Sequence, residues 1–149
     1  MVSKYFMELA IRYAKDGLAK SEVPVGAVVV YNQEVISGAH NQVMSNNNVI
    51  HHAEILALEI AMKTLNTRYL NDCDLYVTLE PCPMCAQAIA FARIRRLYFS
   101  VLDPKGGGVY RMPCIFNYTN HVPEVYEGIL SEQSGELLKR FFSKLRSKI

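Results

Sequence analysis

The sequence predicts an α/β fold in which part of the sheet is parallel. Short runs rich in β-branched or apolar residues at 23–31, 74–80 and 95–101 alternate with longer apolar segments of helical length. This alternation places helices against one or both faces of a sheet, so a two-layer and a three-layer arrangement both remain open. Because no repeat, low-complexity tract or linker interrupts the chain, we expect one domain over residues 1–149.

The first elements are a predicted helix and a hairpin. Apolar side chains three or four residues apart form a helical stripe, which we expect to end at Gly17. The stripe consists of Val2, Tyr5, Phe6, Leu9, Ala10 and Tyr13. The β-branched run 23–31 predicts a buried strand, and a turn over 31–34 leads into a second strand over 34–41.

Helices and strands then alternate after a loop with three consecutive asparagines. The predicted elements are helix 51–65, strand 74–80, helix 81–93, strand 95–101, a glycine-rich loop over 103–108 and helix 129–149. Pro81 favours a helix start at that point, because proline fits the first helical position.

Composition favours a protein of the cytoplasm that has no membrane partner. Half of the residues are apolar and a fifth are charged, and the net charge of +2 is too small to indicate nucleic acid alone. No apolar run approaches the roughly 20 residues that cross a bilayer, and the first residues lack the apolar block of an export signal. In the reducing cytosol, the four cysteines favour metal binding or redox chemistry over disulfides.

A metal site is predicted by one histidine and two cysteines. Cys82 and Cys85 are three residues apart near a helix start, so both can hold one ion, and the helix N-terminus favours their thiolate forms. His52 begins another predicted helix and can complete the set. Three protein ligands leave a tetrahedral zinc ion with one open position, which is typical of catalytic rather than structural sites.

Glu54 is the candidate proton carrier. Two thiolates cancel much of the charge of the ion and weaken its acidifying effect on bound water, so a nearby carboxylate must take the proton. Together with Pro-Cys-x-x-Cys, the His-x-Glu spacing of His52 and Glu54 is the signature of zinc nucleobase deaminases. In that chemistry, zinc-bound hydroxide attacks a ring carbon that bears an amine, and Glu54 passes the proton to the ring nitrogen and to the departing ammonia.

Other interpretations of the cysteine pair remain. Cys-x-x-Cys alone is often a structural zinc site, and the chain could be a zinc-stabilised binding domain without catalysis. Glu54 argues against that class, because a structural site needs no carboxylate in that place. A redox disulfide would need a thioredoxin-like context, which the sequence lacks.

Several blocks resemble bacterial tRNA-specific adenosine deaminases in the same order along the chain. They are EVPVGAVVV (22–30), HAEI (52–55), LYVTLEPCPMC (75–85), DPKGGG (103–108) and EGILSEQSGELLKRFF (127–142). The resemblance implies a cytidine deaminase-like, three-layer α/β/α fold with a five-stranded mixed sheet, in a homodimer. It also implies hydrolytic conversion of adenosine to inosine at the wobble position of a tRNA anticodon stem-loop. Guanine deaminases, or enzymes acting on another free base or nucleoside, share the metal motif and are the alternative.

The resemblance also implies roles for individual residues. His52, Cys82 and Cys85 match the ligands of one zinc ion per subunit, and Glu54 matches the proton shuttle.

Outside the metal motif, Asn41 matches an asparagine that contacts the flipped base, and Asp103 and Lys105 match a loop that touches the RNA backbone. The chain departs from the family pattern at 49–51 (Val-Ile-His) and at 91–92 (Phe-Ala), close to the site.

Basic side chains favour an RNA partner over a free base, together with the Asp-Pro-Lys-Gly loop. They are Arg93, Arg95, Arg96, Lys105, Arg111, Lys139, Arg140, Lys144, Arg146 and Lys148. Such groups can follow phosphates, but charged helix ends are also commonly just solvated. Within the last helix, we expect Phe141 and Phe142 to pack in the core rather than to stack on bases.

Overall fold

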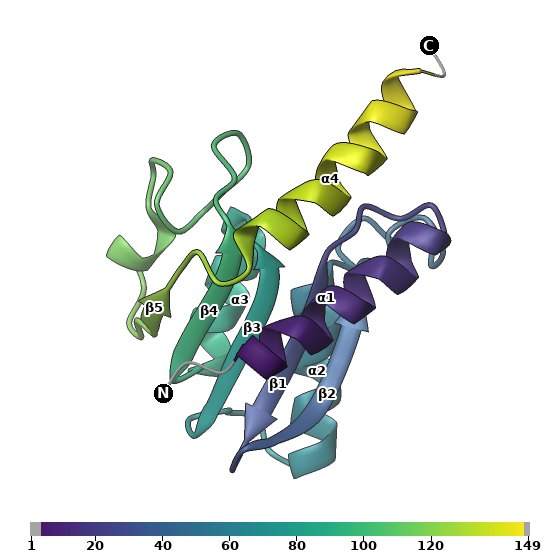
Figure 1. Ribbon diagram of the computed structural model, residues 1–149. Coiled ribbons are helices and arrows are strands. Elements are labelled where there is room, and N and C mark those ends of the chain that lie inside the picture. Colours follow the sequence, from purple (N-terminus) through teal and green to yellow (C-terminus); the bar gives the residue numbers. More distant parts are fainter. Residues whose placement is uncertain (1–3, 148–149) are drawn as a thin grey trace.

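The computed structural model describes residues 4–147, which form a five-stranded sheet between two layers of helices (Figure 1). The helices are α1 (Lys4–Ala19), α2 (Ala53–Leu65), α3 (Pro83–Ala92) and α4 (Ser131–Arg146), with a 3-10 turn η1 (Ile115–Asn117). The strands are β1 (Gly26–Tyr31), β2 (Glu34–His40), β3 (Cys73–Leu79), β4 (Arg96–Val101) and β5 (Glu124–Tyr126). Val2 and Lys148, which the sequence patterns included, lie outside the described residues.

The sheet is mixed, with strand order β2-β1-β3-β4-β5. Strand β1 is antiparallel to both β2 and β3, whereas β3, β4 and β5 run parallel to one another. The predicted α/β class and five-stranded mixed sheet are therefore confirmed. Residue patterns alone missed β5, because three residues are too few to show an alternating pattern.

Two apolar cores cover the two faces of the sheet. Along β1, Ala27 and Val29 face α2 and α3, whereas Val28 and Val30 face α1 and α4. A strand that is buried on both faces is apolar throughout, which is why this segment is a continuous β-branched run. The arrangement confirms three layers, with α1 and α4 on one side of the sheet (Figure 1).

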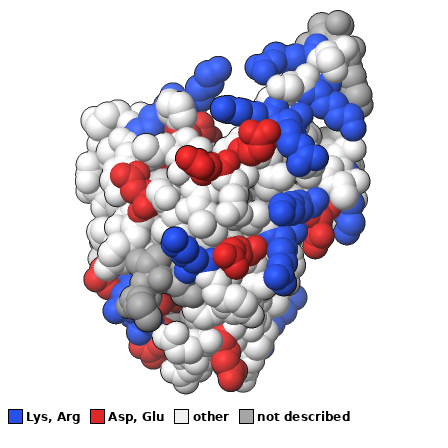
Figure 2. All heavy atoms as spheres, in the orientation of Figure 1, with Lys and Arg blue, Asp and Glu red and all other residues white. Residues whose placement is uncertain are grey.

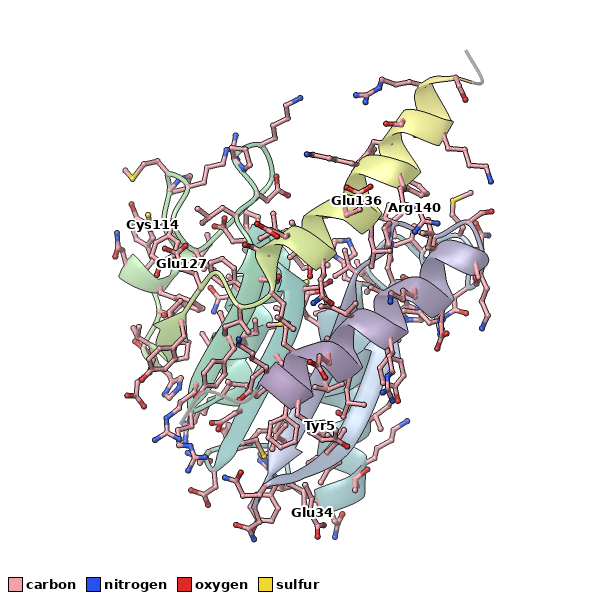
Figure 3. The ribbon with its side chains drawn as sticks, viewed as in Figure 1. Tyr5, Glu34, Cys114, Glu127, Glu136 and Arg140 are labelled. Carbon is pink, nitrogen blue, oxygen red and sulfur yellow. The ribbon has the colours of Figure 1, made fainter. Side chains whose placement is uncertain are left out.

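The buried side of α1 differs in part from the predicted stripe. Phe6 and Ala10 are buried as expected, but Tyr5 is 59% exposed (Figure 3). The remaining buried positions are Met7, Ile11, Ala14 and Gly17. The helix presents these residues, which include the small Ala14 and Gly17, to the sheet, so its last turns can lie close to it. It also continues through Gly17 to Ala19, so the predicted end at Gly17 was wrong.

Helix α4 makes few core contacts. Only Ser134 and Leu137 are buried in it, and Phe142 is 43% exposed, so the expectation of core packing for this phenylalanine was wrong. The C-terminal half of α4 extends away from the sheet (Figure 1). Its last turns therefore have little of the core to pack against. Within residues 4–147, no helix combines the length and the apolar character that crossing a membrane requires.

Strand β1 and helix α1 touch at Gly26. A Cβ atom built at this glycine would lie 1.9 Å from the carbonyl oxygen of Ala10 and 2.6 Å from the amide nitrogen of Ala14. Both obstacles are backbone atoms, so the clash cannot be relieved by turning a side chain. Gly26 therefore sets the spacing between the helix and the sheet.

We expect Gly26→Ala to lower the free energy of unfolding by about 2–3 kcal/mol, because overpacking at a backbone contact forces the helix off the sheet. Urea denaturation followed by circular dichroism measures the change. The matched control is Gly135→Ala in α4, where the nearest atom lies 4.0 Å away. Alanine there should raise stability by about 0.5–1 kcal/mol. Equal effects of the two substitutions would contradict the proposed contact.

Candidate metal centre

Two helix N-termini meet at the candidate metal centre. His52 is the N-cap residue of α2 and Cys82 is the N-cap residue of α3, and both have extended backbones. Cys85 follows in the first turn of α3 and is fully buried. Cys82 and Cys85 thus occupy the cap and the first turn, rather than two positions on one regular helical face. Pro83 stands between them at the first helical position, where its missing N–H costs nothing, so α3 begins two residues later than the start predicted at Pro81.

The three candidate ligands converge as one zinc ion requires. The Nδ1 atom of His52 lies 3.6 Å from Sγ of Cys82 and 3.5 Å from Sγ of Cys85. All three ligand atoms lie within 4.8 Å of one another. A tetrahedral ion with Zn–S bonds of about 2.3 Å and Zn–N bonds of about 2.0 Å holds nitrogen and sulfur about 3.5 Å apart. The side chains therefore fit a single zinc ion.

Glu54 lies beside these ligands in the first turn of α2. Its side chain is 4% exposed, and burial raises the pKa of its carboxyl group to about 7. The carboxyl group also hydrogen bonds with the side chain of Cys85, which places it next to the metal position. His52 and Glu54 reach one site although they are two residues apart, because His52 precedes the helix and Glu54 is inside it.

The pKa values of the two thiols of the centre shift in opposite directions. The hydrogen bond from Cys85 lowers the pKa of Cys82 to about 4, against the opposing effect of burial. The same hydrogen bond, with burial, raises the pKa of Cys85. By contrast, burial raises the pKa of Cys73 to about 11, since no such donor faces it. Cys82 is thus poised as a thiolate, the form in which cysteine binds metal.

Asn41 lies at the end of β2, next to the chain that enters α2. Its backbone N–H donates to the carbonyl of Val25 (3.0 Å), and its side-chain oxygen accepts from the N–H of Val43 (3.3 Å). The following N–H, of Gln42, donates to the carbonyl of His51 (3.0 Å), directly before His52. The structure therefore brings Asn41 to the side of the metal centre.

A buried carboxylate that the sequence patterns did not single out holds the loop after Asn41. Glu22 is fully buried and accepts hydrogen bonds from the backbone N–H groups of Met44 and Ser45 and from the hydroxyl of Ser45. Burial opposes the charge, but these bonds lower the net pKa of Glu22, so its charged form anchors the loop. Its position at the start of the otherwise apolar block EVPVGAVVV was the feature of the sequence that could have indicated a buried carboxylate.

The glycine-rich loop packs on the start of α3. The N–H of Gly108 donates to the carbonyl of Pro81 at 2.8 Å, next to Cys82. Asp103 uses one carboxylate oxygen to accept from the N–H groups of Lys105 (3.1 Å) and Gly106 (3.0 Å). Lys105 is exposed on this loop. The loop that carries Asp103 and Lys105 thus borders the metal centre, and Asp103 also shapes its turn.

Arg95 and Arg96, which follow α3, lie away from the metal centre. Arg95 forms an ion pair with Asp74 at 3.0 Å, and Arg96 pairs with Glu124 at 3.2 Å. Asp74 and Arg96 face each other at the first residues of β3 and β4, whereas Cys82 follows the end of β3. These arginines therefore sit at the opposite end of the sheet from the metal ligands, and their charges are engaged in ion pairs.

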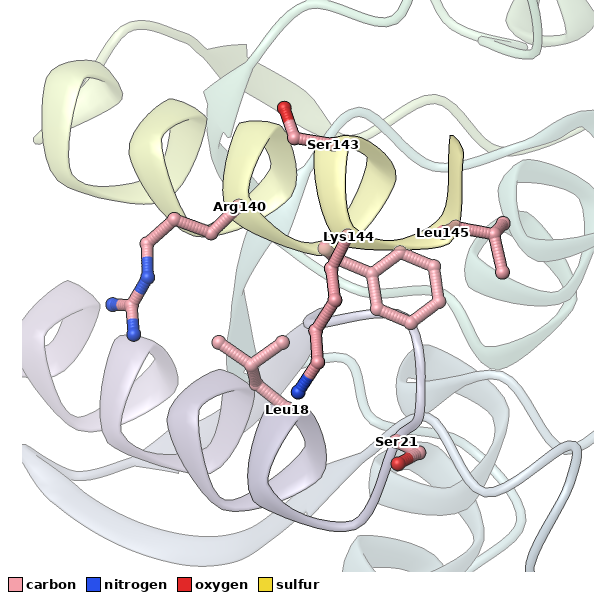
Figure 4. Close-up of a pocket in the computed structure, with 7 residues that line it drawn as sticks. Leu18, Ser21, Arg140, Ser143, Lys144 and Leu145 are labelled. Carbon is pink, nitrogen blue, oxygen red and sulfur yellow. The ribbon is translucent and has the colours of Figure 1, made fainter. Parts of the chain in front are cut away.

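Other basic side chains gather on the free end of α4 (Figure 2). Arg140 and Lys144 border a hollow between α1 and α4, together with Leu18, Ser21 and Phe141 (Figure 4). The hollow contains none of the metal ligands. The exposed lysines and arginines of α4 fit both a solvated helix end and a phosphate-binding surface.

The fold and the site define a metal-dependent deaminase: a three-layer domain with an open His-Cys-Cys centre and a buried glutamate beside it. Residues 1–101 match the family model described as the cytidine and deoxycytidylate deaminase zinc-binding region. The chain belongs to this family, and the metal of its centre is zinc.

Similar proteins cover almost the whole chain. A tRNA-specific adenosine deaminase of Rickettsia typhi is 47% identical over 147 residues, spanning 96% of this chain and 99% of that protein. The tRNA-specific adenosine deaminase of Aquifex aeolicus is 46% identical over 151 residues, spanning 100% of this chain and 99% of that protein. The tRNA-specific adenosine deaminase of Bacillus subtilis is 44% identical, spanning 96% of this chain and 90% of that protein.

Solved structures show the same fold. A structure from studies of A-to-I editing by tRNA:A34 deaminases at the wobble position of tRNA has a TM-score of 0.90 and 45% identity, covering 91% of this chain and 100% of that one. A guanine deaminase of Bacillus subtilis has a TM-score of 0.66 and 27% identity, covering 99% of this chain and 95% of that one. The likeness to the wobble deaminase is thus greater in both measures.

We expect His52→Ala, Cys82→Ala and Cys85→Ala each to reduce the zinc content of the purified protein from one ion per chain to less than half. Removing one of three ligands leaves too few groups to hold the ion. Atomic emission spectroscopy measures the metal. The matched control is Cys114→Ala, which removes a half-buried cysteine outside the centre and should keep full zinc content. Full zinc content in any of the first three variants would contradict the ligand set.

Proposed function

We propose that this protein hydrolytically deaminates adenosine to inosine at the wobble position of tRNA. The observation that carries the proposal is the likeness to the tRNA:A34 deaminase structure, at a TM-score of 0.90 over 91% of this chain, combined with the His-Cys-Cys centre beside Glu54. Guanine deamination is the second candidate, supported by the lower likeness to the Bacillus subtilis guanine deaminase.

Glu54 moves the protons in this proposal, and His52, Cys82 and Cys85 hold one zinc ion. When bound, zinc supplies a polarised, acidified water within the site. Glu54 is suited to its role because a buried carboxyl with a pKa of about 7 can both take up and release a proton near neutral pH. It accepts one proton of the attacking water and delivers it to the purine ring nitrogen. It then takes the proton of the hydroxyl group now bound to the ring carbon and passes it to the amino group, which leaves as ammonia as the carbonyl of inosine forms.

The loops beside the centre recognise the RNA in this proposal. Asn41 contacts the base that is turned out of the stack, since it directly follows β2 and lies next to the chain that enters α2. Asp103 and Lys105 contact the RNA backbone from the loop that packs on α3. The exposed ammonium of Lys105 supplies a charge that phosphate groups attract.

The setting of this chemistry is part of the same proposal. The anticodon stem-loop of tRNA is the partner, and the cytoplasm, where tRNA is abundant, is the location. Residues 1–149 act as one domain. Support comes from the single sheet, which contributes residues to both cores, and from relatives that match nearly the whole chain.

We expect Glu54→Gln to lower kcat on an anticodon stem-loop with adenosine at the wobble position by about 10²–10⁴-fold, because the proton carrier is lost. Inosine is measured by nucleoside mass spectrometry, and zinc content should not change. The control is Glu59→Gln, an exposed glutamate of the same helix, which should keep wild-type kcat.

A substrate panel decides between the two candidate functions. The wild-type protein is incubated in parallel with the stem-loop and with free guanine, adenine, adenosine and cytidine. Inosine in the stem-loop supports the tRNA assignment. Release of ammonia from guanine with unreacted RNA would favour the second candidate and retain the zinc chemistry.

We further infer a homodimer that forms through the outer side of α3. Met84 and Phe91 are seven residues apart and lie on that side, and Phe91 is 72% exposed. Tyr118, 75% exposed, borders the same hollow as Phe91. An apolar stripe on the helix that carries the cysteines matches what a second copy of the chain would cover.

We expect Phe91→Glu to convert the dimer to monomer, because a charge would have to be buried in the interface. Sedimentation velocity measures the change in mass. Tyr5→Glu is the matched control, since it places a charge at an exposed aromatic residue on the other side of the sheet. A dimer that survives Phe91→Glu would contradict the proposed interface.

A further inference from the structure

Glu80 is a buried carboxylate that none of the proposed catalytic steps uses. It follows the end of β3, stands two residues before Cys82 and is 3% exposed. Its own N–H donates to the carbonyl of Val101 at 2.8 Å, which ties the residue to the end of β4. A charge this deeply buried requires hydrogen-bond donors around it.

Three backbone N–H groups surround the Glu80 carboxylate. The N–H of Asp103 donates to Oε1 at 3.0 Å. The N–H groups of Val109 and Tyr110 donate to Oε2 at 3.1 and 2.9 Å. One oxygen therefore binds the beginning of the 103–110 loop and the other oxygen binds its end, so a single side chain closes the loop.

The glycines of the loop are packed against the same group. A Cβ atom at Gly107 would lie 2.4 Å from the carboxyl carbon of Glu80, and one at Gly108 would lie 2.6 Å from the Cα atom of Pro83. Any larger residue would push the loop off the start of α3. The glycines thus permit close packing inside the protein, in contrast to a flexible glycine linker.

We propose that Glu80 is a positioning residue, which holds the substrate-facing loop in register with the helix that carries Cys82 and Cys85. The chain directly after Glu80 leads into α3, and the side chain of Glu80 orders the loop that carries Asp103 and Lys105. The distance between the metal and the RNA-contacting groups is therefore set by this carboxylate. The role in substrate binding rests on the proposed function, whereas the ordering of the loop does not.

The test uses Glu80→Gln in the full zinc-loaded chain. The amide turns an N–H₂ group toward a backbone N–H, so one end of the loop loses its acceptor. We expect KM for the anticodon stem-loop to rise about tenfold, because the loss of one hydrogen bond to a charged group changes an equilibrium by about that factor. The value of kcat should stay within about twofold, since the catalytic groups are untouched. Zinc content should be unchanged, and trypsin should cleave faster after Lys105.

Three companion variants separate positioning from general destabilisation. Glu80→Asp retains the charge and should restore part of the KM. Glu124→Gln removes an exposed carboxylate at the far end of the sheet and should change nothing. Lys105→Ala should itself raise KM, and adding Glu80→Gln to it should raise KM little further, because both changes remove the same contact.

The outcomes decide the proposal even if the assigned substrate is wrong. Loss of zinc, a fall in kcat at constant KM, or fully additive effects with Lys105→Ala would overturn it. If wild-type protein leaves the stem-loop unreacted, the proposed function fails, and trypsin cleavage after Lys105 still tests the loop. Unchanged cleavage in Glu80→Gln would overturn the positioning role. If Glu80→Gln does not fold, trypsin cleavage after Lys105 and KM for the stem-loop are measured on Glu80→Asp instead, and these values test the positioning role.

Discussion

The structure depends on one constraint, the meeting of two helix N-termini at the end of the central strand. His52 and Cys82 are 30 residues apart in sequence, yet both cap helices that start at the same point. Strand β3 leads into α3, while β1 and β2, on the other side of β3, lead toward α2. Because β2 and β3 run in the same direction and finish at the same end of the sheet, the caps of α2 and α3 can share a single ion. The two cores hold the helices in this place.

Electrostatics at this point balance two opposing effects. Helix N-termini favour anions, which suits the Cys82 thiolate and a carboxylate in the first turn of α2. Burial disfavours anions, and for Glu54 it dominates and raises the pKa to about 7. The result is one sulfur ready to bind metal beside a carboxyl that can exchange protons at neutral pH. A site on the open surface would lose the second property, because water would restore the ordinary pKa of Glu54.

The loops around the centre owe their order to buried carboxylates. Glu22 accepts hydrogen bonds from the loop after β2, and Glu80 accepts them from the loop after β4. In each case, backbone N–H groups that would otherwise need water find an acceptor inside the protein. Loops anchored in this way can present Asn41 or Lys105 at a set distance from the metal. The same segments resemble flexible, polar connections when only their composition is considered.

Local patterns in the sequence determined much of this protein. The β-branched run at 23–31 predicted a buried strand, and Pro81 predicted the start of α3 to within two residues. The His-x-Glu and Cys-x-x-Cys spacings predicted the zinc chemistry, because each of these signals depends on residues close in the chain. Tertiary structure alone decided which side of α1 is buried, where β5 pairs and that Glu80 closes the glycine loop. It also placed Arg95 and Arg96 in ion pairs far from the centre. These features arise from contacts between distant segments, whose packing and hydrogen bonds no local periodicity records.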